Sequence, residues 1–422
     1  MARYQLPKGT HDILPDEVGL WQQFEKIVSE ECAKYGYEEI RTPIFEFTGV
    51  FKQENDSSDM VTKEMYNFYS GDTSYTLRPE GTKGVIRAFV EHKLYGNAGE
   101  LPRKFYYIGP MFRHENPQKG RYRQFHQFGV EVLGAKSPLL DAETIALGYD
   151  LTKRLGIKNV QILLNSLGDD ESRDNYRQAL REYFKPYLGE LCEDCQRRYQ
   201  QNPLRILDCK IDRDKECFAN APSIQDYLNE ESKAYFEQVK AALDDLGIPY
   251  VVDDHLVRGL DYYSNTVYEA VPVDAEGQQA AVFAGGQYDG LVDYFGGGPL
   301  PGVGFGMGME RMISLAQEQG GLYMHEKALA AYVISLGDTG AYAFKCVQKL
   351  RDAGLSAEMD YQGRGLKAQF RAADRVHSQS IIIIGEDEVA NGTVQIKNTL
   401  SKEQNTVNFE DVVSAVRKIT GD

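Results

Sequence analysis

The chain has 422 residues and a formal net charge of −16, and its length predicts two or three domains. The acidic balance excludes a general DNA-coating protein, which would be basic throughout. No apolar run reaches about 18 residues, and the first residues lack the apolar core of a secretory signal. We therefore expect no membrane segment and a cytoplasmic location.

The first 168 residues predict a sheet of mainly antiparallel strands with helices around it. Apolar residues at helical spacing predict a helix over residues 16–35, which Gly36 ends. No regular helix separates the strand-like runs that follow, which favours an antiparallel sheet over a doubly wound parallel one. The expected elements are a strand over 38–46 that enters a turn at Pro43, strands at 74–77, 104–109 and 124–133, and a helix at 139–155.

The chain changes character between residues 169 and 254. Helical patterns dominate there, acidic residues outnumber basic ones, and four of the six cysteines lie in this part. We interpret it as an inserted helical domain. Strand signals then return at 261–271 and 280–284, glycine-rich loops run through Gly308, and a helix begins at Met309.

Strand and helix patterns alternate over residues 329–422 and predict a compact C-terminal α/β domain. The expected elements are strands at 330–336, 380–385, 394–396 and 405–408 and helices at 342–353 and 409–419.

The most informative stretch runs from Phe112 to Phe125. Between Arg103 and Arg123 there are six Lys or Arg residues and one acidic residue, although the whole chain is acidic. Guanidinium groups bind phosphate, a carboxylate such as Glu115 accepts hydrogen bonds from a base, and an aromatic ring stacks on one. The stretch predicts a site that handles ATP and the end of an RNA.

A polar face continues along the same strand. Residues at alternate positions share one face of a strand, so Phe125, Gln127 and Glu131 face the same way, and Gly129 leaves space between them. This pattern predicts the floor of a polar pocket. The alternative is a solvated sheet face, which is common in antiparallel sheets.

Two short motifs also concentrate polar groups. Glu80 and Thr82 follow a strand on a glycine-containing turn, where a carboxylate and a hydroxyl can hold an ammonium group. Arg258 precedes Gly259 and two tyrosines, and its guanidinium can bind a phosphate or carboxylate bidentately. The alternatives are an incidental turn for the first motif and a surface arginine beside packed tyrosines for the second.

Glycines occupy alternate positions from Gly302 to Gly308, before a helix that contains Glu310 and Arg311. Alternate glycines clear one face of a strand, so a flat ligand is expected against it. The pattern is not a dinucleotide fingerprint, because Met, Glu and Arg follow where bare backbone would meet a phosphate. No P-loop motif is present either.

Four cysteines have the spacing C-x2-C-x13-C-x7-C: Cys192, Cys195, Cys209 and Cys217. The first pair has the spacing of zinc ligands, so a zinc site is one interpretation. The last pair is too widely spaced for a second zinc knuckle, and free cysteines are common core residues. Unliganded cysteines are therefore the favoured interpretation.

Taken together, these motifs resemble those of class II aminoacyl-tRNA synthetases, and among them the histidyl-tRNA synthetases. The resemblance covers essentially the whole chain. Residues 37–43, 112–125 and 302–311 are similar to the three class motifs, and residues 7–12 to the start of the family. Two stretches, 256–263 and 284–291, are similar to signatures of the histidine enzymes.

The resemblance implies an α+β fold: a six-stranded antiparallel sheet flanked by helices, an inserted helical domain and a C-terminal α/β anticodon-binding domain. The implied domains are a catalytic core at 1–168 and 255–324, an insert at 169–254 and an anticodon-binding domain at 329–422. The chain would activate histidine with ATP to histidyl-adenylate and pyrophosphate and then transfer histidine to the 3′ end of its tRNA. Mg²⁺ would accompany ATP, with no tightly bound cofactor, and the implied partners are a second copy of the chain and tRNA, not DNA.

The resemblance implies histidine binding by Glu80, Gly81, Thr82, Arg113, Gln127, Glu131, Arg258, Tyr262 and Tyr263. Glu80 and Thr82 would hold the α-ammonium group, with help from Gln127. Glu131 and Tyr263 would read the imidazole N–H groups, so that analogues without the donor are rejected.

The resemblance gives catalytic roles to Arg113 and Arg258. Arg113 would bridge the substrate carboxylate and the α-phosphate, and Arg258 would stabilise the charge that develops on that phosphate. No metal ligand is assigned to this site.

ATP binding is implied for Arg113, Glu115, Arg121, Phe125 and Arg311. Phe125 and Arg311 would sandwich adenine, Glu115 would accept a hydrogen bond from its amino group, and Arg121 would meet the terminal phosphate. Gln118 would touch the acceptor end of tRNA.

Asn116 and Gln287 depart from the family, which commonly has arginine at both positions. One alternative is the synthetase-like regulatory subunit of ATP phosphoribosyltransferase, which lacks the C-terminal domain and typically loses parts of the active site. Another is a non-catalytic domain that binds RNA or regulates a kinase. Both are disfavoured, because the motif residues and the stretch 329–422 are present.

Overall fold

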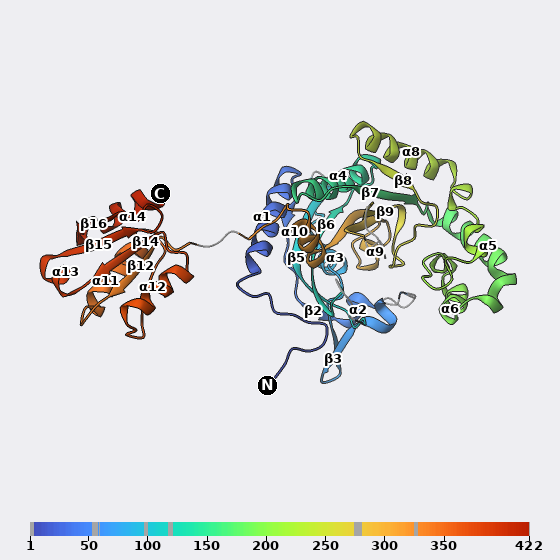
Figure 1. Cartoon of the computed structure of the whole chain (residues 1–422). Coiled ribbons are helices and arrows are strands. Elements are labelled where there is room, and N and C mark those ends of the chain that lie inside the picture. The colour runs from blue at the N-terminus through green and yellow to red at the C-terminus, as the bar shows by residue number, and fades with distance from the viewer. Residues whose placement is uncertain are drawn as a thin grey trace. The chain divides into compact units, whose positions relative to one another are not determined.

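The computed structural model describes residues 4–52, 58, 60–96, 100–116, 121–273, 281–324 and 328–421. The chain divides into two compact units, Met1–Tyr323 and Met324–Asp422. Each unit is described by itself (Figure 1).

The larger unit is built on a sheet with the strand order β1-β5-β6-β11-β10-β9-β7-β8. The neighbours from β5 through β7 pair antiparallel, which confirms the expected six-stranded antiparallel sheet. A short parallel strand is added at each end, because β1 pairs with β5 and β8 with β7. The strands are β1 (Glu38–Glu39), β5 (Arg103–Phe112), β6 (Gln124–Leu133), β7 (Val160–Ser166), β8 (Tyr250–Val252), β9 (Ser264–Pro272), β10 (Phe283–Tyr288) and β11 (Gly302–Gly308).

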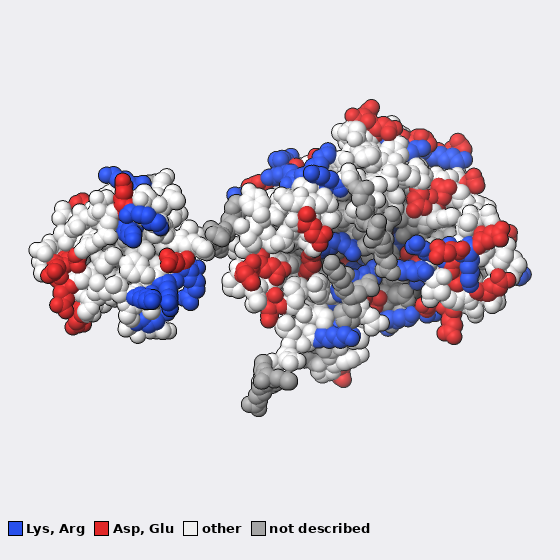
Figure 2. Space-filling view, viewed as in Figure 1, with Lys and Arg blue, Asp and Glu red and all other residues white. Residues whose placement is uncertain are grey.

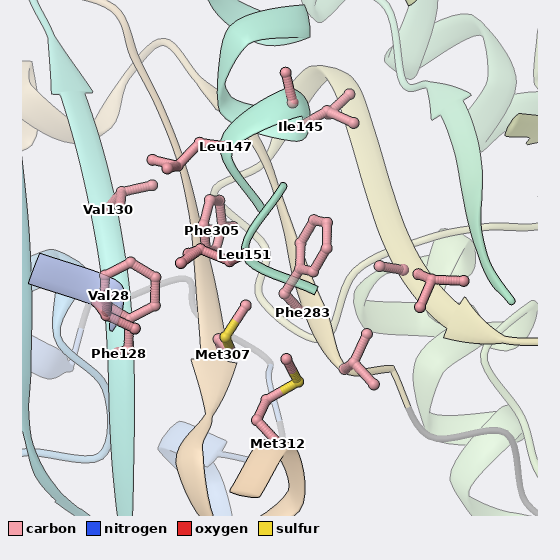
Figure 3. Packing of buried hydrophobic residues seen from close by; sticks show 14 of the residues in the cluster. Val28, Phe128, Val130, Ile145, Leu147, Leu151, Phe283, Phe305, Met307 and Met312 are labelled. Carbon is pink, nitrogen blue, oxygen red and sulfur yellow. The ribbon is translucent and has the colours of Figure 1, made fainter. Parts of the chain in front are cut away.

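Helices α1 (Val18–Lys34), α4 (Pro138–Arg154), α8 (Glu230–Asp245) and α10 (Met309–Glu318) share one hydrophobic core with the sheet. Phe128 and Val130 of β6 reach this core together with Phe305 and Met307 of β11 (Figure 3). Since side chains alternate along a strand, Gln127 and Glu131 of β6 point to the opposite face. The helix core thus fixes the direction in which the polar residues of β6 project.

A second cluster lies on that opposite face, where α3 (Thr82–Glu91) and α9 (Leu291–Tyr294) pack against β5. Beside it, β2 (Phe45–Phe47), β4 (Thr73–Leu77) and β3 (Tyr66–Ser70) form a small antiparallel sheet, with α2 (Thr48–Phe51) and the π-helix η1 (Met60–Glu64) nearby. The stretch 38–46, expected to be a strand that enters a turn at Pro43, contains β1 and the start of β2 on either side of that proline. Its first part pairs in the large sheet and its last part in the small one, and Pro43 between them has no N–H to donate to a ladder.

The inserted segment has a small core of its own, from Leu167 to Leu228, which also holds Leu256 and Val257. Its elements are α5 (Asp170–Phe184), η3 (Lys185–Glu190), α6 (Glu193–Gln201), η4 (Pro203–Ile206), α7 (Glu216–Ala219) and η5 (Ile224–Asp226). The helix that follows, α8, contributes instead to the core on the sheet. The separate core therefore ends near Leu228.

The C-terminal unit is a five-stranded sheet with the order β13-β12-β14-β15-β16, in which β13, β12 and β14 run parallel. Hydrophobic clusters lie on both of its faces, as expected of an α/β domain. The elements are β12 (Ala331–Ser335), α11 (Gly340–Asp352), β13 (Ala357–Met359), α12 (Leu366–Arg375), β14 (Ser380–Ile384), α13 (Glu386–Asn391), β15 (Thr393–Asn398), β16 (Gln404–Asn408), η6 (Phe409–Asp411) and α14 (Val412–Thr420). Among the described residues of both units, no helix is long and apolar enough to cross a membrane.

Candidate active site

A buried carboxylate, Glu131, lies near the middle of the large sheet. Its side chain is 1% exposed, and it accepts a hydrogen bond from Thr82 at 2.6 Å, one from Tyr107 at 3.4 Å and one from Tyr288. Burial raises the pKa of Glu131 to about 8, although the hydrogen bonds from Thr82 and Tyr288 oppose this shift. The three hydroxyl groups come from three different elements, so the pocket exists only in the folded chain.

Glu80 holds the turn that brings Thr82 to this carboxylate. Its two oxygens accept the backbone N–H groups of Thr82 at 2.6 Å and Lys83 at 3.0 Å, at the beginning of α3. A carboxylate at a helix N-terminus satisfies donors that have no partner in the helix. Glu80 and Glu131 are therefore both tied to the first residues of α3.

The ring of Tyr107 lies between two glycines. A Cβ atom on Gly81 would lie 2.2 Å from this ring, and one on Gly129 would lie 2.3 Å from it. The space expected above Gly129 is therefore occupied by tyrosine, which corrects the interpretation of that glycine as a gap in the pocket. Tyr107 comes from β5, which is hydrogen-bonded directly beside β6, and Tyr107 is paired with Gly129 in that ladder.

The alternate glycines of β11 give room to polar side chains of the pocket. A Cβ atom would lie 2.2 Å from Tyr288 at Gly302, 2.4 Å from the Glu131 carboxylate at Gly304 and 2.4 Å from the Gln127 amide at Gly306. Among the described residues, nothing lies within 4 Å of a Cβ atom on Gly308. The glycine face expected to accept a flat ligand is thus open in the structure at Gly308.

Arg258 lies in the segment between β8 and β9. Its Nη1 atom forms an ion pair with Glu269 of β9, and its guanidinium carbon lies 5.7 Å from the centre of the Tyr263 ring. Burial lowers the pKa of Arg258, but Glu269, Tyr263, Tyr262 and Asp208 together raise it by more, so that the pKa is raised overall. Within the described part of the chain, Nε of Arg258 is buried without a hydrogen-bond partner. Arg258 thus holds a positive charge and a free donor in a buried position.

Tyr262 connects this segment to the pocket. Its ring centre lies 4.8 Å from that of Tyr263 and 5.8 Å from that of Tyr288. Tyr263 lies close enough to Glu131 and Glu80 for both charges to raise its pKa, although burial is the largest cause. Thr82, Tyr262 and Tyr263, three of the residues predicted to bind histidine, therefore lie near Glu131.

The basic stretch forms a second group beside the first. Arg113 donates to the carbonyl oxygen of Pro79 at 2.8 Å, next to Glu80, and its guanidinium carbon lies 5.2 Å from the centre of the Phe125 ring. Glu115 lies 3.9 Å from Arg113 and 3.4 Å from Arg121. Arg113 thus stands between the two groups of predicted site residues.

Arg311 at the start of α10 donates to the carbonyl oxygen of Ala281 at 3.3 Å. Burial lowers the pKa of Arg311, and the nearby charge of Arg121 lowers it further. The two guanidinium groups therefore lie within electrostatic range of each other. Lys and Arg side chains gather around the middle of the larger unit on the face that Figure 2 shows. Gln118, predicted to touch tRNA, is outside the described residues, and Asn116 is exposed.

A family model described as histidyl-tRNA synthetase matches residues 9–312, and a model of an anticodon binding domain matches residues 330–419. The chain belongs to the histidyl-tRNA synthetase family. Among curated relatives, the histidine–tRNA ligase 1 of Shouchella clausii is 50% identical, and the histidine–tRNA ligase of Bacillus subtilis is 48% identical. Both matches cover 98% of this chain and 98% of the relative.

Solved structures agree with this membership. Apo histidyl-tRNA synthetase of S. aureus is 41% identical, with a TM-score of 0.82 over 98% of this chain and 100% of that one. A Bacillus halodurans structure titled as an ATP phosphoribosyltransferase regulatory subunit/histidyl-tRNA synthetase is 19% identical, with a TM-score of 0.64, so it shares the fold alone.

Three residues of this family member's site were not among the predicted site residues: Tyr107, Tyr288 and Glu269. Tyr288 stands in a stretch similar to a histidine signature, and Glu269 is the one charged residue of β9, a strand that is otherwise almost wholly buried. These two features are the sequence signals that point to Tyr288 and Glu269 as site residues. No sequence signal singled out Tyr107. Gln287, one of the two departures from the family, is 1% exposed and donates to Asp289 at 2.7 Å.

The clustered cysteines of this synthetase-family chain do not assemble as a set of four. The ligand atoms of Cys192, Cys195, Cys209 and Asp212 all lie within 4.8 Å of one another, and Cys217 is not a member of this group. The four-cysteine set considered from the sequence is therefore wrong in its last member. The turn after Cys209 brings a carboxylate to the position that the sequence pattern left for a thiol.

Proposed function

We propose that this chain is a histidine–tRNA ligase that forms histidyl-adenylate from histidine and ATP and then transfers histidine to the 3′ end of its tRNA. The observation that carries the proposal is the buried carboxylate of Glu131, surrounded by three hydroxyl donors. Membership in the family and the full-length match to curated histidine–tRNA ligases support the same activity.

Histidine selection rests on Glu131 and Tyr263. The imidazole ring offers an N–H donor, and Glu131 is the acceptor at the floor of the pocket. An analogue without this donor leaves a buried carboxylate unpaired, which costs far more than a missing apolar contact. Tyr262 and Gly81 line the same pocket, and Gly81 is needed because Tyr107 fills the space where its Cβ atom would lie.

The α-ammonium group of histidine is held by Glu80 and Thr82, with help from Gln127. Without substrate, Glu80 is engaged with backbone N–H groups and Thr82 with Glu131. The Oε1 atom of Gln127 is buried without a partner in the described part of the chain. This orphan acceptor supports a role in binding a donor such as an ammonium group.

Adenylate formation requires the histidine carboxylate to attack the α-phosphate of ATP while pyrophosphate leaves. Arg113 holds the carboxylate and the α-phosphate together, and Arg258 stabilises the charge that develops on that phosphate. Arg258 suits this role, because its guanidinium is half-buried and its buried Nε has no partner among the described residues. Both arginines act by position and charge, and neither forms a covalent intermediate.

ATP is held by the second group of residues. Phe125 and Arg311 take the adenine ring, Glu115 accepts from its amino group, and Arg121 meets the terminal phosphate. The close pair of cations, Arg121 and Arg311, supports binding of a polyanion. Mg²⁺ enters as the companion of ATP and would neutralise the leaving pyrophosphate.

Residues 1–168 and 255–324 form the catalytic core, 169–254 the helical insert, whose last elements α8 and β8 pack with the large sheet, and 329–422 the anticodon-binding domain. The match of an anticodon-binding model to residues 330–419 supports the last assignment. Gln118 meets the acceptor end of tRNA. Two copies of the chain form the active enzyme in the cytoplasm, where tRNA is charged for protein synthesis.

The test is histidine-dependent exchange between ATP and labelled pyrophosphate by the full-length chain. Exchange with histidine and none with the other amino acids is the expected result. A chain that catalyses no exchange but binds a phosphoribosyltransferase would instead be a regulatory subunit. The presence of Arg113, Glu115, Arg258 and Arg311 favours the ligase, since the regulatory subunits typically lose parts of this site.

A further inference from the structure

Two tight turns of the inserted segment bring three thiols and one carboxylate together. Cys192 precedes α6 and Cys195 lies in its first turn, while Cys209 and Asp212 belong to a turn that follows η4. The four ligand atoms lie within 4.8 Å of one another. The residues that the proposed ligase reaction uses do not include any of the four.

The two pairs have the same spacing, in the sequences Cys-x2-Cys and Cys-x2-Asp. In the second pair, the backbone N–H of Asp212 donates to the Cys209 sulfur at 3.3 Å. Two turns of this spacing, each with a possible metal ligand at both ends, are typical of zinc knuckles.

The distances agree with tetrahedral coordination. A zinc–sulfur bond of about 2.3 Å places two sulfur ligands of a tetrahedral site about 3.8 Å apart. The sulfurs of Cys192 and Cys209 are 3.7 Å apart, and Cys209 lies 3.8 Å from Oδ2 of Asp212. All six cysteines of the chain are free thiols, so no disulfide accounts for this approach.

The cluster includes a buried carboxylate. The side chain of Asp212 is 1% exposed, and burying a charge is costly unless it is paired. Lys215 pairs with Oδ1 at 2.8 Å, and the backbone N–H of Cys192 donates to Oδ2 at the same distance. Oδ2 also faces the thiols, which are weak donors. A cation among the four groups would satisfy all of them at once.

We propose that Cys192, Cys195, Cys209 and Asp212 bind one Zn²⁺ ion as a structural site. Three thiolates and one carboxylate fill four positions and leave none for substrate, which is the character of a structural rather than a catalytic zinc site. The site ties the beginning of α6 to the turn after η4, in a segment whose separate core is small. Cys217 packs in that core without belonging to the donor set.

The ion also supports the segment that holds Arg258. Between the two knuckles, Asn202 donates to Asp261 at 3.0 Å, and Arg205 donates to the carbonyl oxygen of Arg258 at 3.2 Å. Loss of the ion would release the chain that makes these contacts. Histidine activation would therefore decline when the metal is removed, a consequence that rests on the proposed ligase activity.

The primary test measures metal, not activity. The full-length chain, purified under reducing conditions without chelator, is expected to contain about one zinc ion per chain by plasma mass spectrometry. Cys209→Ser is expected to lose most of this zinc, while the matched control Cys217→Ser keeps it. Equal loss from both variants would overturn the assignment of Asp212 as the fourth ligand, and a metal-free wild-type chain that takes up no added Zn²⁺ would overturn the site itself.

Cobalt gives a readout that does not depend on how the variants fold. Co²⁺ added to the zinc-depleted wild-type chain is expected to give intense thiolate-to-cobalt charge-transfer absorption and the visible bands of a tetrahedral ion, and Zn²⁺ should displace it. Weak bands of octahedral Co²⁺ would refute the proposal. Asp212→Asn is expected to keep the thiolate absorption but bind the ion more weakly, since one anionic ligand becomes neutral.

Discussion

Tyr288 of β10 donates its phenol hydrogen bond to the carboxylate of Glu131 on β6, across the intervening strand β11. The two side chains meet over Gly302 and Gly304, where any Cβ atom would collide with one of them. The carboxylate proposed to recognise imidazole is thus positioned by a residue 157 positions away in the chain. The four predictions below concern Glu131 and residues near it.

The stability of the chain is expected to depend on pH through Glu131. Its pKa is raised to about 8 in the folded state, so between pH 5 and 8 the folded chain keeps a proton that the unfolded chain releases. This contribution to stability is full below the unfolded pKa and is lost as the pH rises through about 8. Its size is on the order of a few kcal/mol, since each pKa unit corresponds to about 1.4 kcal/mol.

Denaturant unfolding of the larger unit at several pH values checks this. Glu131→Gln should remove the part of the pH dependence that comes from this group. Asp141, whose pKa burial raises to about 7, contributes in the same direction and should still do so in the variant. Identical pH slopes for wild type and Glu131→Gln would contradict the prediction.

Tyr288→Phe is expected to weaken histidine binding. Above pH 8, where folded Glu131 is charged, the phenol helps to hold the carboxylate in place, and a hydrogen bond to a charged group contributes about 1.5–3 kcal/mol. The KM for histidine in pyrophosphate exchange should therefore rise by about 10- to 100-fold. The matched control is Tyr107→Phe, which removes a longer contact of 3.4 Å and should have a smaller effect. Equal increases in the KM for histidine in the two variants would contradict a specific role of Tyr288 in holding Glu131.

Arg258→Ala is expected to lower adenylate formation by about 100-fold or more, as loss of a donor to developing charge does elsewhere. The same change leaves the half-buried Glu269 without its partner, which destabilises the fold by about 1–3 kcal/mol. Adding Glu269→Gln should restore much of the stability and none of the activity. Single-turnover formation of histidyl-adenylate measures the effect on activity, and denaturant unfolding measures the effect on stability. Recovered activity in the double variant would contradict a catalytic role of Arg258.

Gly129→Ala is expected to destabilise the larger unit by about 1–3 kcal/mol, since its methyl group would overlap the Tyr107 ring and force it to move. Gly308→Ala is the control within the same sheet, and its stability should change by about 0.5 kcal/mol or less. Because Gly308 faces open space where adenine is proposed, that variant should instead show a higher KM for ATP. Similar unfolding curves for both variants would contradict the interpretation that Gly129 is tightly packed and Gly308 faces open space.

The alternation of residues along one strand could be predicted from the sequence. The two-residue period placed Phe125, Gln127 and Glu131 on one face of β6, and the structure shows Phe128 and Val130 in the core on the other. The same local rules predicted the C-terminal α/β unit, because its strands and helices have clear apolar patterns and short connections. Period and turn chemistry act over a few residues, so they can be read without knowing the fold.

Only the tertiary structure decided which residues meet through strand order and register. Nothing near Gly129 in the chain shows that Tyr107 fills its space, and nothing near Arg258 except a lone charge in the next strand points to Glu269. The cysteine spacing suggested a fourth thiol, but the turn after Cys209 presents Asp212 instead. The sequence by itself thus determined which residues are polar, apolar or chemically capable. The folded chain decided which of them meet, because register and the direction of each turn depend on the packing of the whole unit.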